Sequence, residues 1–302
     1  MCFFSVILVT YNSSRYIEES ISSVLNQTYK NFELIIIDDG STDKTINIIK
    51  KFKDNRIKYK YQTNQGPSKA RNFGIKISKS RWICFIDADD YWHKNKLKVV
   101  NKFLSGNNLI YHKLHKKVEF KKQNLHITQS KLQYSLFQKY IGSKIKNPIA
   151  QNLLIYGNTI PTSSVVIRKK ILKKFKSFDE KLRIGEDYDL WLRLSLVTDK
   201  FMFIPENLGT YRIHIESATK KKKDITKLVM NIEKKYHHVL NNYEKVLNIS
   251  RHEYSIGRKY FHLGQYSKSI KIFKKTFYKG TFFIKIKSLI SIFVIIVIKL
   301  IK

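Results

Sequence analysis

The sequence predicts an α/β protein, with helices on both faces of a sheet and a helical appendage after it. Two observations predict this class. In the first part of the chain, continuous apolar runs of strand length alternate with segments of helical periodicity, which is typical of βαβ units. After residue 217 the composition becomes strongly basic, and a helical hairpin is indicated at 254–275. We therefore expect an α/β domain at 1–217 and a basic helical region at 218–302.

Each element is predicted by its own pattern. Residues 5–9 form a continuous β-branched and aliphatic run, as in a strand buried on both faces. A helix should follow, capped by Ser13 or Ser14, because apolar residues then recur on one face up to Leu25. The stretch 106–157 carries no assignable motif, and we expect loops and helices there. The remaining elements expected in the first domain are strands at 32–37, 56–61, 82–86 and 163–168 and helices at 42–52, 68–78, 169–175 and 186–196.

The charge of the chain has two possible explanations. The formal net charge is +35, and clustered Lys and Arg attract anionic membranes and polyanions. The excess is mostly Lys and comes with abundant Ile and Asn, which is also the composition that an A- and T-rich genome produces. We expect no nucleic-acid partner.

The cysteine content indicates a reducing compartment, and the first residues are those of a strand. Cys2 and Cys84 cannot form a disulfide framework or a cysteine-based zinc site. Residues 1–10 are apolar but lack a cationic leader and a small-residue cleavage site. We interpret them as a first strand and expect no signal peptide.

The end of the chain is basic and apolar at once. Residues 217–302 contain 20 Lys and Arg against 4 Asp and Glu, and 289–301 is almost wholly aliphatic. A spanning helix needs about 20 apolar residues, and here lysines at 287 and 299 interrupt the run. We favour a membrane-interfacial helix near 281–301. A tilted span with snorkelling lysines and a buried packing helix stay open.

An acidic cluster follows the predicted strand at 82–86. The spacing of Asp87 and Asp89 lets both carboxylates reach one side of a turn, and such oxygen ligands suit Mg²⁺ or Mn²⁺. A divalent cation at this place would neutralise a leaving group that gains negative charge. The alternative is an acidic surface turn.

Two more acidic segments occupy similar places. Asp38 and Asp39 end the strand at 32–37, where they could accept hydrogen bonds from a nucleoside, or form a turn with Ser41 or Thr42 capping the next helix. Glu186 and Asp187 lie at the start of a predicted helix. They could serve as helix caps, as a general base, or as both.

Taken together, these segments resemble family 2 glycosyltransferases with the GT-A fold, which has a mixed, Rossmann-like sheet. The resemblance covers about residues 3–217. It is carried by six motifs in order, namely 5–12, 38–43, 64–72, 87–90, 186–191 and 211–214.

The resemblance implies a role for each motif. The nucleoside pocket would be lined by Thr10, Tyr11, Asn12, Asp38 and Asp39, with Lys69 and Arg71 over the nucleotide. Asp87 would bind ribose or metal, and Asp89 would bind the metal, Mn²⁺ or Mg²⁺, together with His214. Asp187 would be the general base, supported by Glu186, and Arg212 would stabilise the diphosphate in a segment that begins at Tyr211.

The function that this implies is transfer of a sugar from a nucleotide diphosphate donor, a UDP-sugar, to an acceptor hydroxyl with inversion. The acceptor would be a glycan or lipid-linked glycan bound partly by 106–157, at the cytoplasmic face of a membrane. One alternative is an inactive homologue that binds glycan or membrane. A sugar-1-phosphate nucleotidylyltransferase is another, although residues 10–15 lack the glycines of its phosphate loop; a metal-dependent nuclease is a weaker rival.

Overall fold

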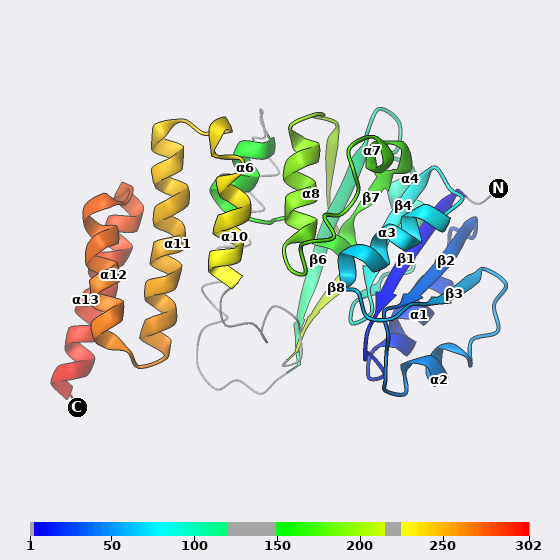
Figure 1. Cartoon of the computed structure of the whole chain (residues 1–302), viewed down its shortest axis with the longest axis horizontal. Helices are drawn as coiled ribbons and strands as arrows, with labels where there is room; N and C mark the ends of the chain where they lie inside the picture. The colour runs from blue at the N-terminus through cyan, green and yellow to red at the C-terminus, as the bar shows by residue number, and fades with distance from the viewer. Residues whose placement is uncertain (1–2, 120–148, 215–224, 302) are drawn as a thin grey trace. The chain divides into compact units, whose positions relative to one another are not determined.

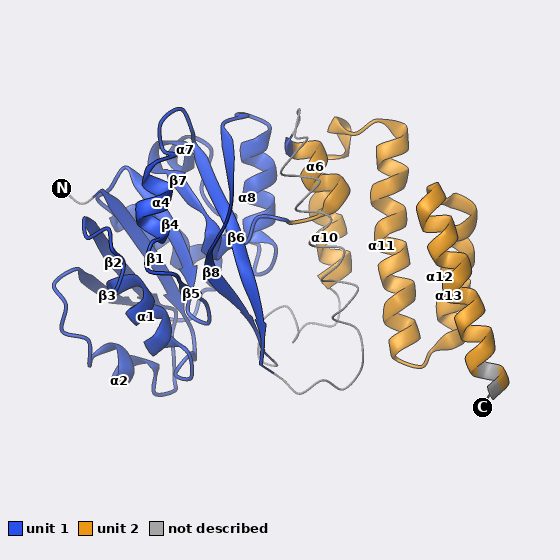
Figure 2. Cartoon of the chain, turned by 180° about the vertical axis from the view of Figure 1, so that it is seen from behind, with its two compact units in different colours: residues 1–149, 159–221 blue, residues 150–158, 222–302 orange. Residues whose placement is uncertain are grey.

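A computed structural model describes residues 3–119, 149–214 and 225–301 of the chain. They divide into two compact units, residues 1–149 with 159–221 and residues 150–158 with 222–302 (Figure 2). The boundary that we expected at 217 lies outside the described residues. Residues 150–158, which the sequence placed in the first domain, group with the second unit.

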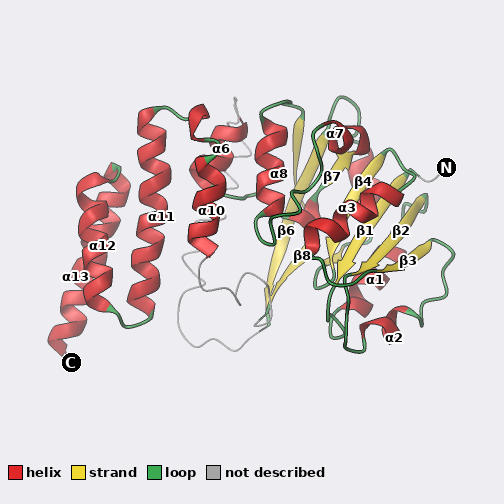
Figure 3. Cartoon of the chain, viewed as in Figure 1, coloured by secondary structure: helices red, strands yellow, loops and turns green. Residues whose placement is uncertain are grey.

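The first unit is built on one mixed sheet of eight strands in the order β3-β2-β1-β4-β7-β6-β8-β5 (Figures 1 and 3). β1, β2, β3 and β4 pair in parallel, and β7 joins β4 in the antiparallel sense. The strands are β1 Phe4–Thr10, β2 Phe32–Asp38, β3 Ile57–Tyr61, β4 Trp82–Asp87, β5 Tyr91–Trp92, β6 Leu109–Val118, β7 Val166–Arg168 and β8 Phe201–Ile213.

Helices cover both faces of this sheet, as predicted. Alternate residues of β1 and β2 pack against α1, while Ile35 and Ile37 of β2 pack on the other face against Ala70 of α3. The contact is close there, because a Cβ on Gly74 of α3 would lie 2.6 Å from Cγ2 of Ile7. The helices of this unit are α1 Ile17–Leu25, α2 Thr45–Ile49, α3 Pro67–Ile77, α4 Lys96–Asn101, α7 Lys169–Lys174 and α8 Glu186–Ser195, with a 3₁₀ turn η1 at Thr162–Ser164.

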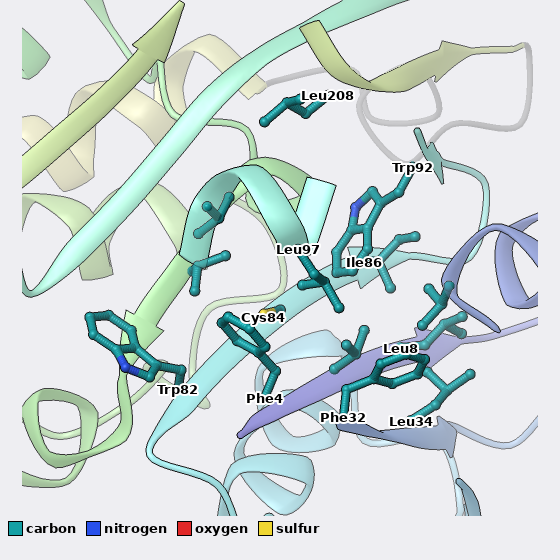
Figure 4. Packing of buried hydrophobic residues seen from close by; sticks show 14 of the residues in the cluster. Phe4, Leu8, Phe32, Leu34, Trp82, Cys84, Ile86, Trp92, Leu97 and Leu208 are labelled. Carbon is teal, nitrogen blue, oxygen red and sulfur yellow. The ribbon is translucent and has the colours of Figure 1, made fainter. Parts of the chain in front are cut away.

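The core lies between the sheet and the helices α1 and α4 (Figure 4). β-strand residues such as Phe4, Leu34 and Cys84 are fully buried there. Burial raises the pKa of the Cys84 thiol to about 12, so it behaves as a small hydrophobic residue. This rigid layer holds the strand ends that carry the acidic motifs.

The predicted helix caps are wrong. α1 begins at Ile17 with Tyr16 as N-cap, and α2 begins only at Thr45 with Lys44 as N-cap. The reason is that the loops after β1 and β2 bind each other. The Ser41 hydroxyl accepts from the Asn12 amide at 2.9 Å, and the Ser13 amide donates to the Thr45 hydroxyl at 2.9 Å.

The expectation of loops and helices across 106–157 is also wrong for its first part. Residues 109–118 form β6, which pairs in parallel with β8 along its length. The helix α6, Ile149–Tyr156, closes the stretch. Residues 120–148 lie outside the described residues.

The second unit consists of helices. Besides α6 these are α10 Ile225–Lys234, α11 Asn242–His262, α12 Tyr266–Lys279 and α13 Phe282–Ile301, with a 3₁₀ turn η2 at His237–Val239. The predicted hairpin is present as α11 and α12, and Gly264 between them has a φ of +70°. Within the described parts of the chain, no helix combines the length and the apolar character that crossing a membrane requires.

Candidate active site

Two of the acidic motifs and the end of β1 lie at one edge of the sheet. Thr10 of β1 is paired with Asp38 of β2, and the preceding Val9 is paired with Asp87 of β4. Because the three strands are parallel, their carboxyl ends meet at this edge, which is where open α/β sheets bind ligands.

Arg71 joins two acidic segments that are far apart in the sequence. Its Nη2 donates to Oδ1 of Asp87 at 2.8 Å, and its Nη1 donates to Oε1 of Glu186 at 2.6 Å. The guanidinium is nearly fully buried and also lies over the Phe178 ring, 5.3 Å from its centroid. The structure therefore brings the end of β4 and the start of α8 together around one cation.

Asp187, the predicted general base, has a raised pKa. Burial and the nearby Glu186 carboxylate raise its pKa to about 6, while Arg71 opposes this rise. Its Oδ2 accepts a hydrogen bond from the Thr162 hydroxyl at 2.9 Å. The turn that places it requires glycine, because the N-cap Gly185 has a φ of +75°.

Asp87 is fixed through its backbone as well as its carboxylate. Its amide donates to the Ser163 hydroxyl at 3.0 Å. The Ser163 carbonyl in turn accepts from Nζ of Lys96 at 2.8 Å and from Nε1 of Trp92 at 2.9 Å. Burial raises the pKa of Asp87, and Arg71 acts against that rise.

Asp89 and His214, the predicted metal ligands, are in contact. Oδ2 of Asp89 and Nε2 of His214 form a hydrogen bond of 2.9 Å. A carboxylate oxygen and an imidazole nitrogen side by side are chemically able to bind one divalent cation. Among the described residues no group of three or more His, Cys, Asp or Glu side chains could hold a metal. The remaining ligands would have to come from elsewhere, as a diphosphate and water can provide them.

Arg212 lies beside this pair but is held by the protein. It donates to Glu119 at 3.1 Å and to the Asp89 carbonyl at 2.8 Å, and it forms an ion pair with Glu19. Its backbone amide donates to Asp90 at 2.9 Å, which attaches β8 to the acidic turn. These contacts position Asp89, while a contact of Arg212 with a diphosphate stays a prediction.

Asp38 and Asp39 are buried and engaged with neighbouring loops. Oδ1 of Asp39 accepts from the Gln65 amide at 2.9 Å and Oδ2 from the Gly66 amide at 2.8 Å. Asp38 accepts from the Tyr59 hydroxyl at 3.1 Å. Their direct contact with a nucleoside stays a prediction, and the structure gives Asp39 a role in ordering the loop before α3.

The other predicted binding residues lie at the same loops. Tyr11 is 51% exposed, and Oδ1 of Asn12, whose φ is +48°, accepts from the Thr42 amide at 2.8 Å. The Thr10 side chain is buried, and Nζ of Lys69 donates to Gln65 at 3.2 Å. Burial raises the pKa of Tyr211, and the charges of four aspartates add to this rise; these are Asp90, Asp89, Asp87 and Asp187.

Sequence reasoning missed Thr162, Ser163 and Lys96. Thr162 and Ser163 sit in the 3₁₀ turn η1, where isolated hydroxyl residues carry no motif. Lys96 is fully buried at the first position of α4. A lysine is seldom fully buried, so only its place just after the acidic motif could have drawn attention to it.

The mixed sheet, with acidic residues at the carboxyl ends of its parallel strands, is of the GT-A type. The chain belongs to the family "Glycosyl transferase family 2", whose model matches residues 5–174. An uncharacterized glycosyltransferase of Rickettsia bellii is 38% identical over 194 residues, which are 63% of this chain and 26% of that protein. The chain thus spans about a quarter of the length of this relative.

Solved structures share the fold. The Staphylococcus aureus protein TarS, residues 1–349 in complex with UDP-GlcNAc, has a TM-score of 0.62 at 21% identity over 93% of this chain and 82% of that chain. The mannosyltransferase PcManGT from Pyrobaculum calidifontis, in complex with GDP-Man and Mn²⁺, has a TM-score of 0.60 at 13% identity over 95% of this chain and 79% of that chain.

Proposed function

We propose that this chain transfers a sugar, of the hexosyl or N-acetylhexosaminyl type, from a UDP-sugar to an acceptor hydroxyl with inversion. One observation carries the proposal. Arg71 bridges Asp87 and Glu186, at 2.8 and 2.6 Å, which supports Asp187, the neighbour of Glu186, as the general base beside the edge that would bind the donor. The solved complexes of TarS with UDP-GlcNAc and of PcManGT with GDP-Man support a nucleotide-sugar donor.

The reaction follows from the state of Asp187. With a pKa of about 6, the carboxylate is ionised at neutral pH yet remains basic enough to take a proton. It accepts the proton of the acceptor hydroxyl while that oxygen attacks the anomeric carbon. The bond from this carbon to the diphosphate breaks on the opposite side, which inverts the configuration. The Thr162 hydroxyl holds the carboxylate in place for this step.

Asp89 and His214 would hold the divalent cation, Mn²⁺ or Mg²⁺, in this scheme. The bound cation would supply positive charge to the diphosphate leaving group. Arg212 holds the Asp89 backbone, and Asp90 holds β8, so both act on the geometry of this pair. The Mn²⁺ in the PcManGT complex supports the assignment.

The rest of the site is assigned by the same logic. Thr10, Tyr11 and Asn12 would contact the nucleoside, and Asp38 and Asp39 would border it; Lys69 would lie over the nucleotide. We propose a glycan or lipid-linked glycan as acceptor, in polysaccharide or lipid-linked glycan biosynthesis at the cytoplasmic face of a membrane.

The test is turnover by the purified full chain. UDP-, GDP- and dTDP-sugars are supplied with Mn²⁺, and release of the nucleotide is measured. The Asp187→Asn variant should lose at least about 100-fold in rate while it still binds UDP. Asp199→Asn, which changes an exposed aspartate away from the site, should keep wild-type activity.

The rival functions give other outcomes. Tight UDP binding without turnover of any sugar donor would indicate an inactive homologue. Loss of Mn²⁺-dependent UDP binding in Asp89→Asn and His214→Ala would support the metal pair. Unchanged Mn²⁺ dependence in both variants would refute it, even if the transferase activity itself were established.

A further inference from the structure

One face of α13 is an apolar stripe that other described residues leave uncovered. Its side chains recur at every third or fourth position along the helix, and we call these six residues the α13 stripe. They are Phe282, Ile286, Leu289, Phe293, Ile296 and Leu300, with exposed fractions of 69%, 42%, 55%, 66%, 46% and 81%. At 1.5 Å per residue the stripe is about 27 Å long.

The opposite face of α13 is the one that packs on its own unit. Ile284 and Ile295 are buried there, and the fully buried Ser288 has its hydroxyl 2.7 Å from that of Thr276 in α12. On this side the Tyr254 hydroxyl of α11 lies 3.1 Å from that of Ser291. α13 is therefore held by one face, and the stripe points away from the helices that hold it.

The charge around the stripe has one sign. Residues 254–302 contain 11 Lys and Arg and no Asp or Glu. The exposed Phe283, Ile290 and Val294 widen the apolar face on one side of the stripe. At 100° per residue, Lys285 and Lys287 fall on the two borders of this wider face. A second copy of this chain would bring the same positive charge, so self-association through this face is disfavoured. An anionic surface with an apolar interior complements both features.

We propose that the α13 stripe binds the surface of a membrane containing anionic lipids. The helix lies parallel to the surface, because its packed face is held by α11 and α12 while the stripe and the neighbouring exposed Phe283 and Ile290 face the acyl chains. The lysines beside the stripe contact the anionic headgroups. This proposal concerns the second unit and does not depend on the transferase activity.

Flotation of the full chain with lipid vesicles tests this. The wild type should float with vesicles of phosphatidylglycerol and phosphatidylcholine, and much less with phosphatidylcholine alone. Leu289→Ser with Phe293→Ser, and separately Lys285→Glu with Lys287→Glu, should each reduce the bound fraction by about tenfold or more. High salt should weaken the binding of the wild type, because screening acts on the lysine contribution.

A matched control lies on α11. Val246 and Ile249 are each 40% exposed, and Val246→Ser with Ile249→Ser should leave vesicle binding unchanged. Circular dichroism would show that all variants keep their helices. Equal binding by wild type and stripe variants would overturn the proposal, as would a dimer that the stripe substitutions dissociate in a chain that does not float.

Discussion

The Arg71 guanidinium donates to the Glu186 carboxylate at 2.6 Å, and this contact places a buried negative charge beside the proposed base. Glu186 raises the pKa of Asp187, second only to burial, and Arg71 lowers it. The pKa of about 6 thus results from burial and one neighbouring anion, which raise it, and one buried cation, which lowers it. Changing either charge should move the pH range in which the site works.

Glu186→Gln should shift the acid limb of the pH profile downward. The amide oxygen of Gln can still accept from Arg71, but the negative charge that raises the pKa of Asp187 is gone. Asp187 then loses its proton at a lower pH, so activity persists to lower pH than the wild-type limb near pH 6. The dependence of kcat/KM on pH measures this directly.

The control for this prediction is Glu180→Gln. Glu180 accepts a hydrogen bond from Asn72 at 3.0 Å but does not contact Asp187 or Arg71 in the described structure. Its replacement should leave the limb where it is. An unmoved limb in Glu186→Gln would show that a group other than Asp187 sets the profile.

Asp187→Asn should stabilise the fold at neutral pH. The folded-state pKa of about 6 lies above the ordinary 3.8, so ionisation of Asp187 costs folding free energy as pH rises through this window. The cost is complete above pH 6, about 3 kcal/mol, and disappears below about pH 4. Urea unfolding should therefore show the variant more stable at pH 8, by about twice the difference seen at pH 5.

This gain would accompany the loss of turnover, as happens where a site keeps an unfavourable charge for chemistry. Asp199→Asn provides the comparison, because that side chain is exposed. Equal stability of Asp187→Asn and the wild type at pH 8 would show that ionised Asp187 is not strained in the folded chain.

The parallel strands β1, β2, β3 and β4 were predictable, whereas β5, β6 and β8 on the other side of the sheet were not. β1, β2 and β4 are buried on both faces, so each is a continuous apolar run that local sequence alone identifies. β8 contains Pro205 and Gly209, and its pairing with β6 shifts register after His112. Such a strand is held by a partner about ninety residues away, and no local periodicity reports that pairing.

The candidate site divides in the same way. The acidic residues were recognisable because they directly follow apolar runs. Arg71 was recognisable because it lies in 64–72, one of the six motifs that carry the family resemblance. Lys96 was not, because it acts by donating to the Ser163 carbonyl, and Ser163 acts by accepting from the Asp87 amide with its hydroxyl. Both contacts depend on how α4, η1 and β4 lie in space. The caps of α1 failed for a related reason, since the Ser13 amide binds the Thr45 hydroxyl and the Ser13 hydroxyl donates to the Tyr11 carbonyl at 3.2 Å instead of capping the helix.

Ser163→Ala should destabilise the fold and displace Asp87. The Ser163 hydroxyl accepts from the Asp87 amide at 3.0 Å, and alanine leaves that donor without its acceptor. A lost partner of this kind costs about 1–3 kcal/mol. We expect lower stability in urea unfolding and weaker UDP binding by calorimetry.

Ser195→Ala is the matched control. Its hydroxyl only donates to the Leu192 carbonyl at 2.8 Å, at the end of α8, so its removal should change stability by less than about 0.5 kcal/mol. If Ser163→Ala and Ser195→Ala changed the stability equally little, the hydrogen bond of Ser163 with Asp87 would not stabilise the fold.

The last prediction concerns the two adjacent aspartates at the end of β2, which differ in what their carboxylates accept. Asp39 accepts from the backbone amides of Gln65 and Gly66 with different oxygens. In Asp39→Asn one oxygen becomes an NH₂ group facing a donor, so the loop before α3 loses a hydrogen bond. We expect a loss of about 1–3 kcal/mol in stability and faster hydrogen exchange of these two amides.

Asp38→Asn should be milder, because the Tyr59 hydroxyl that donates to Asp38 at 3.1 Å can turn and accept from the new NH₂ group. The other oxygen keeps its contact with the Ser41 amide at 2.9 Å. Since Gly66 is the N-cap of α3, which carries Arg71, Asp39→Asn should also disturb the position of Arg71 at the acidic edge. Equal effects of the two substitutions on exchange at residues 65 and 66 would contradict the role given to Asp39.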